Sequence, residues 1–344
     1  MNNMGGFQIK KRELLKYDGS DTRVTVPEGV MRLGKKAFAD NPTVTELIIP
    51  DSVTEIDRNA FSGCASLKEA ILPRGIKILP AEAFRGCAAL ERITVPEGVT
   101  EIGSMAFSDC ASLTEVNIGD GVKRIGGGAF SGCASLESIR LPDGVSSLGY
   151  AVFRGCSALK RFNVPKGVTS ITPWCFALCG SITELHVPEQ VTLIKNNAFQ
   201  QCASLRSVTL PTSLEFVGIN AFSGCDAIKE VNVAADKLHL LESSGVASFT
   251  EAIVGRLRQY ASGQLTPSEK SAVTLYIARK TDVITRLIPE NAVLLCFVTE
   301  KGLIDTRKAE QLLTVCESPE SRAILLEYLN SNGETVDIDG EFKL

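Results

Sequence analysis

Histidine and tryptophan are nearly absent from this chain, which has two histidines and one tryptophan among 344 residues. A Ser-His-Asp or Cys-His catalytic arrangement would therefore have to use His186 or His239. The surrounding pattern places His186 outward in the middle of a strand and His239 in a junction, and neither position indicates catalysis. Cys175 and Cys179 form the only close cysteine pair, with no second pair and no histidine nearby. The sequence predicts no enzyme, no metal and no cofactor.

Basic excess and long apolar runs are also missing. The net charge is −4 and no basic cluster appears, which argues against nucleic-acid binding. No apolar run reaches the roughly 18 residues of a membrane span, so no membrane insertion is expected. The opening residues MNNMGGFQIKKRELLKYDGS lack the apolar core of a secretory signal. We therefore expect a cytoplasmic protein, with the cell surface or secretion as the alternative if the sequence is a trimmed form.

What the chain does have is a repeat of 23 residues. Phenylalanine recurs at this step from Phe38 to Phe222, and cysteine follows it at the same step from Cys64 to Cys225. One unit reads VTEIGSMAFSDCASLTEVNIGDG, residues 99–121. Because a single unit cannot bury enough apolar surface to fold alone, such units stack into a solenoid whose coils share one core. The pattern predicts nine coils over residues 24–235.

Each unit combines a strand with a helical turn. The L-x-x-V-x-I-P stretch alternates apolar and polar residues, which is typical of a strand, and the proline then ends its pairing. In the I-G-x-x-A-F-x-x-C-x-x-L stretch, apolar residues recur every three or four positions, as in a short helical turn. The cysteine has the spacing of a core residue, so we interpret the eight repeated cysteines as small buried thiols and not as disulfides.

The motif V-x-x-I-G-x-x-A-F-x-x-C-x-x-L-x-x-I-x-I-P resembles the BspA-type bacterial leucine-rich repeat. The resemblance covers about residues 24–233 and implies a non-enzymatic binding module. Many such proteins are surface proteins used for adhesion, so the resemblance also implies a bacterial cell-surface adhesin or carbohydrate-binding protein as an alternative. Residues 1–23 include a stretch, 7–23, that resembles the short hairpin that often caps these arrays. The expected fold is thus an α/β-type repeat solenoid with a parallel β-sheet, followed by an all-α domain.

The repeat ends near Ala234, and a helical period follows over residues 236–332. Thr266 and Glu269 form a capping box that opens a helix to about Lys280. Further helices are predicted over residues 291–301, from Asp305 to Cys316, and from Ser318 to about residue 330. Cys296 and Cys316 are predicted to lie in the core. This region is loosely similar to ankyrin- or HEAT-like helix pairs, and residues 333–344 are expected to be a flexible tail.

The outward strand positions vary in size and charge where the core positions repeat, so this sheet face is the predicted binding surface. Trp174 lies on the opposite rim in a position filled in most other coils by polar residues or glycine, and an exposed tryptophan can anchor a partner. The candidate partner-binding residues are Asn117, Arg140, Arg161, Asn163, Trp174, Glu184 and His186. The predicted function is a protein-interaction scaffold of unknown partner and oligomeric state. An enzyme within residues 236–344 has no motif in its favour.

Overall fold

The computed structural model describes residues 2–287 and 291–332. The chain divides into two compact units, one formed by Met1–Lys229 with Ser243–Ala247 and the other by Glu230–Glu242 with Ser248–Leu344. The sequence predicted the boundary between residues 235 and 236, a few residues after the point where the first unit gives way to the second, between Lys229 and Glu230. The predicted tail, residues 333–344, lies outside the described residues.

The first unit begins with antiparallel strands β1 (Asn2–Met4), β2 (Phe7–Lys10) and β3 (Glu13–Tyr17). Strand β3 then pairs in parallel with β5 (Arg32–Leu33), the first strand on its side of the solenoid. The Tyr17 ring packs at 5.2 Å from Phe38. The three opening strands therefore cover the edge of the first coil and supply an aromatic ring that continues the core.

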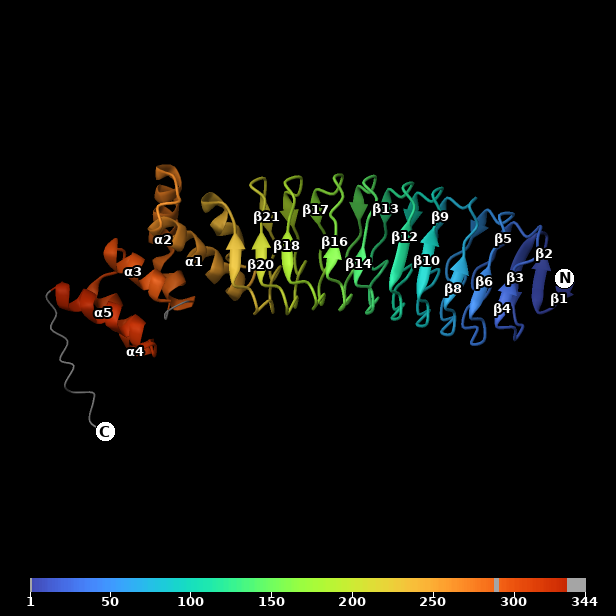
Figure 1. Ribbon diagram of the computed structural model, residues 1–344, viewed down its shortest axis with the longest axis horizontal. Helices are drawn as coiled ribbons and strands as arrows, with labels where there is room; N and C mark the ends of the chain where they lie inside the picture. The colour runs from blue at the N-terminus through green and yellow to red at the C-terminus, as the bar shows by residue number, and fades with distance from the viewer. Residues whose placement is uncertain (1, 288–290, 333–344) are drawn as a thin grey trace, which may run out of the picture. The chain divides into compact units, whose positions relative to one another are not determined.

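Each coil contributes two short strands, and equivalent strands of successive coils line up along the unit (Figure 1). The strands of the first row, called the longer strands because most of them have three or four residues, are β4 (Arg23–Thr25), β6 (Glu46–Ile48), β8 (Glu69–Ile71), β10 (Arg92–Val95), β12 (Glu115–Ile118), β14 (Ser138–Ile139), β16 (Arg161–Phe162), β18 (Glu184–His186) and β20 (Ser207–Thr209). Those on the second side are β5, β7 (Glu55–Ile56), β9 (Ile78–Leu79), β11 (Glu101–Ile102), β13 (Arg124–Ile125), β15 (Ser147–Leu148), β17 (Ser170–Ile171), β19 (Leu193–Ile194) and β21 (Phe216–Val217). The parallel repeat solenoid is thus confirmed.

Neither row of strands is one continuous sheet. The longer strands pair in the blocks β4 to β12, β14 with β16, and β18 with β20, and the second row has breaks between β7 and β9 and between β15 and β17. One break has a clear cause. Gly103 and Gly126 each donate an N–H to the preceding coil, to the carbonyls of Leu79 and Ile102 at 2.7 Å. Pro80 stands at the same position of its coil and has no N–H to donate to Ile56.

The core is a column of phenylalanine rings with a column of cysteine thiols beside it. Neighbouring rings from Phe38 to Phe222 lie 4.8–5.8 Å apart, centroid to centroid. Each repeated cysteine donates its S–H to the phenylalanine carbonyl of the preceding coil, as Cys133 does to Phe107 at 3.2 Å. The eight repeated cysteines are free and buried, which confirms their interpretation as core residues. The predicted helical turn is a run of tight turns closed by bonds such as Cys64 N–H to the Phe61 carbonyl.

Two positions in each coil have left-handed backbone, and one of them predicts a stabilising substitution. The position after Ala177 in its coil is glycine in most other coils, but here it is Leu178, with φ +65° and a side chain that is 38% exposed. A Cβ atom in left-handed backbone costs about 1–2 kcal/mol. We expect Leu178→Gly to raise the free energy of unfolding by about 1 kcal/mol, measured by urea denaturation. Gln201→Gly, at the same position one coil later, is the matched comparison. A loss of stability in both variants would contradict this account.

The second unit contains the strand β22 (Glu230–Asn232), a 3₁₀ helix over Ala235–Leu241 and the helices α1 (Val246–Ala261), α2 (Pro267–Leu287), α3 (Ala292–Glu300), α4 (Thr306–Val315) and α5 (Pro319–Ser331). Asn291, Asp305 and Ser318 cap α3, α4 and α5 with their side chains. The capping box also forms, with Thr266 Oγ1 and Glu269 bonded to each other and to the backbone. Among the described helices, none is long and apolar enough to cross a membrane.

The helix starts follow the predictions closely, but two details were wrong. Helix α2 continues to Leu287, beyond the predicted end at Lys280, because no glycine or proline interrupts it there. Cys296 is exposed, whereas Cys316 is buried as predicted. Leu294, Leu295, Phe297 and Val298 supply the buried face of α3, and Cys296 lies between them in sequence on the side left to solvent.

Candidate functional site

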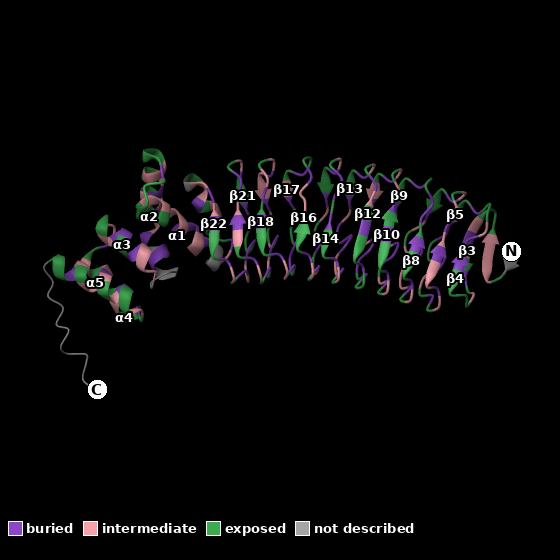
Figure 2. Cartoon of the chain, in the orientation of Figure 1, coloured by how far each residue is buried: buried purple, intermediate pink, exposed green. Residues whose placement is uncertain are grey.

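The candidate site is the face formed by the outward side chains of the longer strands, from β4 to β20. In most of these strands one inward residue is buried between two that are exposed or half-buried, as in Glu184–His186. Figure 2 shows exposed residues along strands of this row, such as β10 and β18. Within the blocks the strands are in register, so Arg92 lies between Glu69 and Glu115. The face therefore presents columns of charged and polar groups on a backbone fixed by pairing. Two hollows interrupt it.

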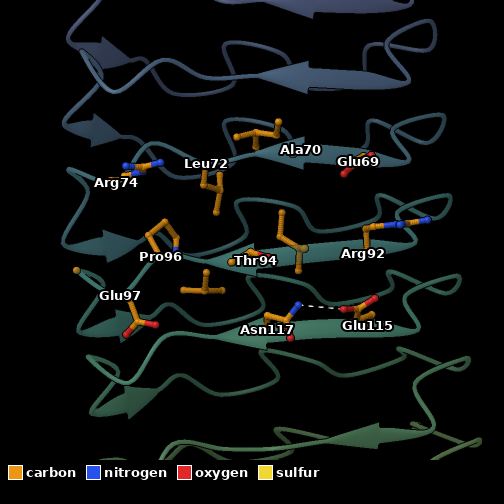
Figure 3. Close-up of a pocket in the computed structure, with 14 residues that line it drawn as sticks. Glu69, Ala70, Leu72, Arg74, Arg92, Thr94, Pro96, Glu97, Glu115 and Asn117 are labelled. Carbon is orange, nitrogen blue, oxygen red and sulfur yellow. Dashed lines mark hydrogen bonds between the residues drawn. The ribbon is translucent and has the colours of Figure 1, made fainter.

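The first hollow, of about 600 Å³, lies over β8, β10 and β12. Figure 3 shows side chains from these three strands around it, with Asn117 donating its amide to Glu115 at 3.0 Å. Ile71, which also lines it, is 54% exposed. A large exposed apolar side chain between charged groups is a common feature of a protein-binding surface.

The second hollow, of about 920 Å³, lies where pairing stops between β16 and β18. It brings together four of the predicted residues, Arg161 and Asn163 from one coil with Glu184 and His186 from the next. Arg161, Glu184 and His186 are exposed, and Asn163 is half-buried. The sequence-based candidates thus surround one opening in the sheet.

The remaining candidates are dispersed. Asn117 lines the first hollow. Arg140 is exposed just after β14 and lines neither hollow. Trp174 is 37% exposed and borders a separate depression with Tyr150 and Arg154, whose guanidinium carbon lies 5.9 Å from the indole centroid. The structure therefore does not unite all seven residues in a single site.

Asn163 has a role that its position in the sequence does not reveal. Its Oδ1 accepts the N–H of Leu141 at 2.7 Å, and its Nδ2 donates to the Leu141 carbonyl at 2.9 Å. The amide thus satisfies both backbone groups of a residue in the preceding coil. Asn163 therefore lines the second hollow and also holds its own coil to the preceding one through these two bonds.

Phe162 also lines this hollow, although it was not among the candidates. It occupies the inward strand position, which in the other coils is held by Ala, Val, Ile or Leu, from Leu47 to Val231. Its ring is only half-buried, and it stacks on Phe176 with the centroids 4.2 Å apart. An aromatic residue in an otherwise aliphatic column was the sequence signal that could have identified it.

Glu189 lies next in sequence to Pro188, a residue that lines the second hollow. Glu189 follows β18 by a few residues, and its carboxylate accepts backbone N–H groups from Thr212 and Ser213. These bonds, with the Thr212 backbone first, lower the pKa of Glu189. Across the described ranges, no cluster of three or more His, Cys, Asp or Glu is placed to hold a metal ion.

The stacked parallel coils, the phenylalanine column and the exposed strand face define the class of leucine-rich repeat solenoids. The family model for the BspA type leucine rich repeat region matches residues 11–137 and 123–244, which together are well over half of the chain. The chain belongs to this family, and repeats of this kind are typically non-enzymatic binding modules.

Solved structures also resemble about two thirds of the chain. A leucine-rich repeat protein from Bacteroides ovatus shares 27% identity at a TM-score of 0.53, over 65% of this chain and 68% of that one. The pneumococcal vaccine antigen PcpA shares 20% identity at a TM-score of 0.50, over 64% of this chain and 63% of that one, and supports the fold alone. No curated protein matches the chain.

Proposed function

We propose that this protein is a non-enzymatic scaffold that binds protein partners through the exposed face of the longer strands, from β4 to β20. The observation that carries the proposal is the second hollow, where exposed charged side chains from two coils surround half-buried apolar ones. Charged groups around an apolar centre are the arrangement of a specific protein interface. The fold supports the proposal, because coils fixed by their neighbours present a wide surface at little further cost in conformational entropy.

We further propose that the scaffold works in the cytoplasm. Its cysteines support this, since all eleven are free. A chain with this many cysteines outside disulfides suits a compartment in which glutathione and thioredoxin keep thiols reduced.

Replacing Arg140 and Arg161 with glutamate tests the binding face. Both side chains are exposed, so we expect the double variant to lose captured partners at least about tenfold while its thermal unfolding changes little. The measurement is quantitative pull-down from a lysate of the source organism. The matched control is Arg58→Glu with Lys77→Glu, which makes the same change of charge at exposed positions outside the longer strands. Equal capture by both double variants would place the binding surface elsewhere.

A further inference from the structure

We propose that the opening between β16 and β18 is an anchor pocket for an aromatic side chain carried by an acidic, extended segment of a protein partner. This inference rests on the proposed function and specifies the partner's chemistry. It begins from the hydrogen bonds between the two coils. In a regular coil, Arg206 and Ser207 donate their N–H groups to the Thr183 carbonyl of the preceding coil. For Thr183 and Glu184, both in the described range, the structure has no such bond to Lys160.

Phe162 distinguishes this opening from the break between β12 and β14, where the described residues Glu137 and Ser138 also lack such bonds but the inward residues are aliphatic. The other inward residues of this column are aliphatic, and the regular phenylalanine column already fills the space behind them. Phe153 and Phe199 lie 5.3 and 5.4 Å from Phe176, and Phe162 adds a third ring to Phe176 at 4.2 Å. An extra ring in a close-packed interior displaces the backbone that carries it. The coils are therefore held apart where β16 and β18 would otherwise pair.

The opening is bounded on the other sides, so it is a pocket and not a general separation of the coils. In the phenylalanine column, Phe153 N–H still bonds to the Cys175 carbonyl at 2.9 Å. Beyond the strand, the Gln190 side chain donates to the Val164 and Pro165 carbonyls. On the second side, Thr172 donates its hydroxyl to the Gly149 carbonyl at 2.6 Å. These bonds hold the opening in shape without a ligand, which lowers the entropic cost of filling it.

The lining favours an aromatic anchor. Phe162 and Val164 are half-buried, whereas the residues in their columns one coil later, Leu185 and Val187, are buried. A partner's ring can stack on the exposed part of Phe162 and cover the apolar surface that the missing strand pairing leaves open. Aromatic residues in such pockets commonly dominate the energy of protein interfaces.

The charges beside the pocket favour acidic residues next to that anchor. Lys160 is paired with Glu137 at 3.2 Å. Arg140 and Arg161 are exposed, and neither takes part in the ion pairs found among residues 2–287 and 291–332. Two guanidinium groups on the same block of strands can each bind a carboxylate in bidentate geometry. Glu184, on β18, disfavours acidic residues on that side and thereby orients the segment.

The test uses the full chain and a short fluorescent peptide with phenylalanine at its centre and glutamates on one side of it, tested in both sequence directions. We expect anisotropy to detect binding, and we expect at least about tenfold weaker binding when the central residue is alanine or when lysine replaces the glutamates. Arg161→Glu should weaken binding of the glutamate peptide and strengthen that of the lysine peptide. A peptide that fails to bind the wild-type protein, or that binds equally well in all three forms, overturns the inference.

Phe162→Val separates the pocket from a general effect on folding. Removing the extra ring should let β16 and β18 pair, so peptide binding is lost while the thermal unfolding temperature is maintained or raised. Hydrogen exchange at Thr183 and Glu184, fast in the wild-type protein, should slow to the rates of Arg206 and Ser207. Ile139→Val, in the same column of the adjacent coil, is the matched control. It should change neither peptide binding nor hydrogen exchange at Thr183 and Glu184.

The two proposals fail in different ways. If Phe162→Val slows exchange and the peptide still binds, the pocket is not the anchor. If the peptide does not bind the wild-type protein while the Arg140/Arg161 double variant still loses captured partners, the scaffold proposal stands and this inference is wrong. If that double variant captures the same partners as the wild-type protein, the binding face itself is wrong.

Discussion

Raising the pH from 8 to about 10.5 is expected to lower the free energy of unfolding of the whole solenoid by several kcal/mol. Burial raises the pKa of the Cys110, Cys156 and Cys175 thiols to about 12, against a usual value of 9.0. Well below pH 9 these thiols are protonated in both the folded and the unfolded chain, so their contribution to stability is complete. Between pH 9 and about 12 the unfolded chain releases protons that the folded chain retains, and stability is lost.

The magnitude follows from the size of the shift. Three pKa units correspond to about 4 kcal/mol per thiol at the upper limit, and at pH 10.5 each thiol costs about 2 kcal/mol. Urea denaturation followed by circular dichroism, with a reductant present, measures the effect. Cys156→Ala should lower stability at pH 8, because it removes the S–H bond to the Phe130 carbonyl, but its stability should depend less on pH. An unchanged urea midpoint from pH 8 to 10.5 would exclude this role of the thiols.

Phe130→Ala is expected to cost roughly 3–5 kcal/mol of unfolding free energy, the usual loss when a fully buried phenylalanine is truncated. The Phe130 ring has 0% exposure and lies between Phe107 and Phe153, with centroid distances of 5.3 and 5.7 Å. Truncation therefore leaves a cavity at two interfaces between coils. Because stability in a repeat array depends on such nearest-neighbour interfaces, one change weakens both.

Phe216→Ala is the matched control for this loss. Phe216 is in β21 but 42% exposed, and its ring contacts the ammonium group of Lys195 at 5.3 Å. The same chemical change should therefore cost less than about 1 kcal/mol. Chemical denaturation of both variants, compared at one temperature, provides the measurement. Equal losses would show that the phenylalanine column does not carry the stability assigned to it.

The regular part of this fold is predictable from the sequence because it depends on residues that recur. Phenylalanine, cysteine and the strand motif share one step of 23 residues, and a side chain that repeats at that step meets its own equivalent in the next coil. The caps at Thr266, Asp305 and Ser318 were also visible, because a capping residue acts on backbone only a few positions away.

The irregular part was harder to predict, because it depends on how one coil meets the next. The break at Pro80 arises from a missing donor to Ile56, and the opening at Phe162 arises from its contact with Phe176. The outward columns correctly placed Arg161, Glu184 and His186 on one face. They could not show that a hollow lies between them, nor that the amide of Asn163 is already bonded to Leu141.

The opening at Phe162 also divides the mechanical strength of the array. Both rows of strands are interrupted between the coil of β15 and β16 and the coil of β17 and β18. This junction therefore depends on the phenylalanine column, on the backbone bonds of the tight turns beside it, such as Phe153 N–H to the Cys175 carbonyl, and on a few side-chain bonds. Under tension along its length, the solenoid would therefore yield first at this junction, leaving a segment of intact coils on either side. A partner seated in the opening would bridge the two segments, so that binding also acts as a clamp.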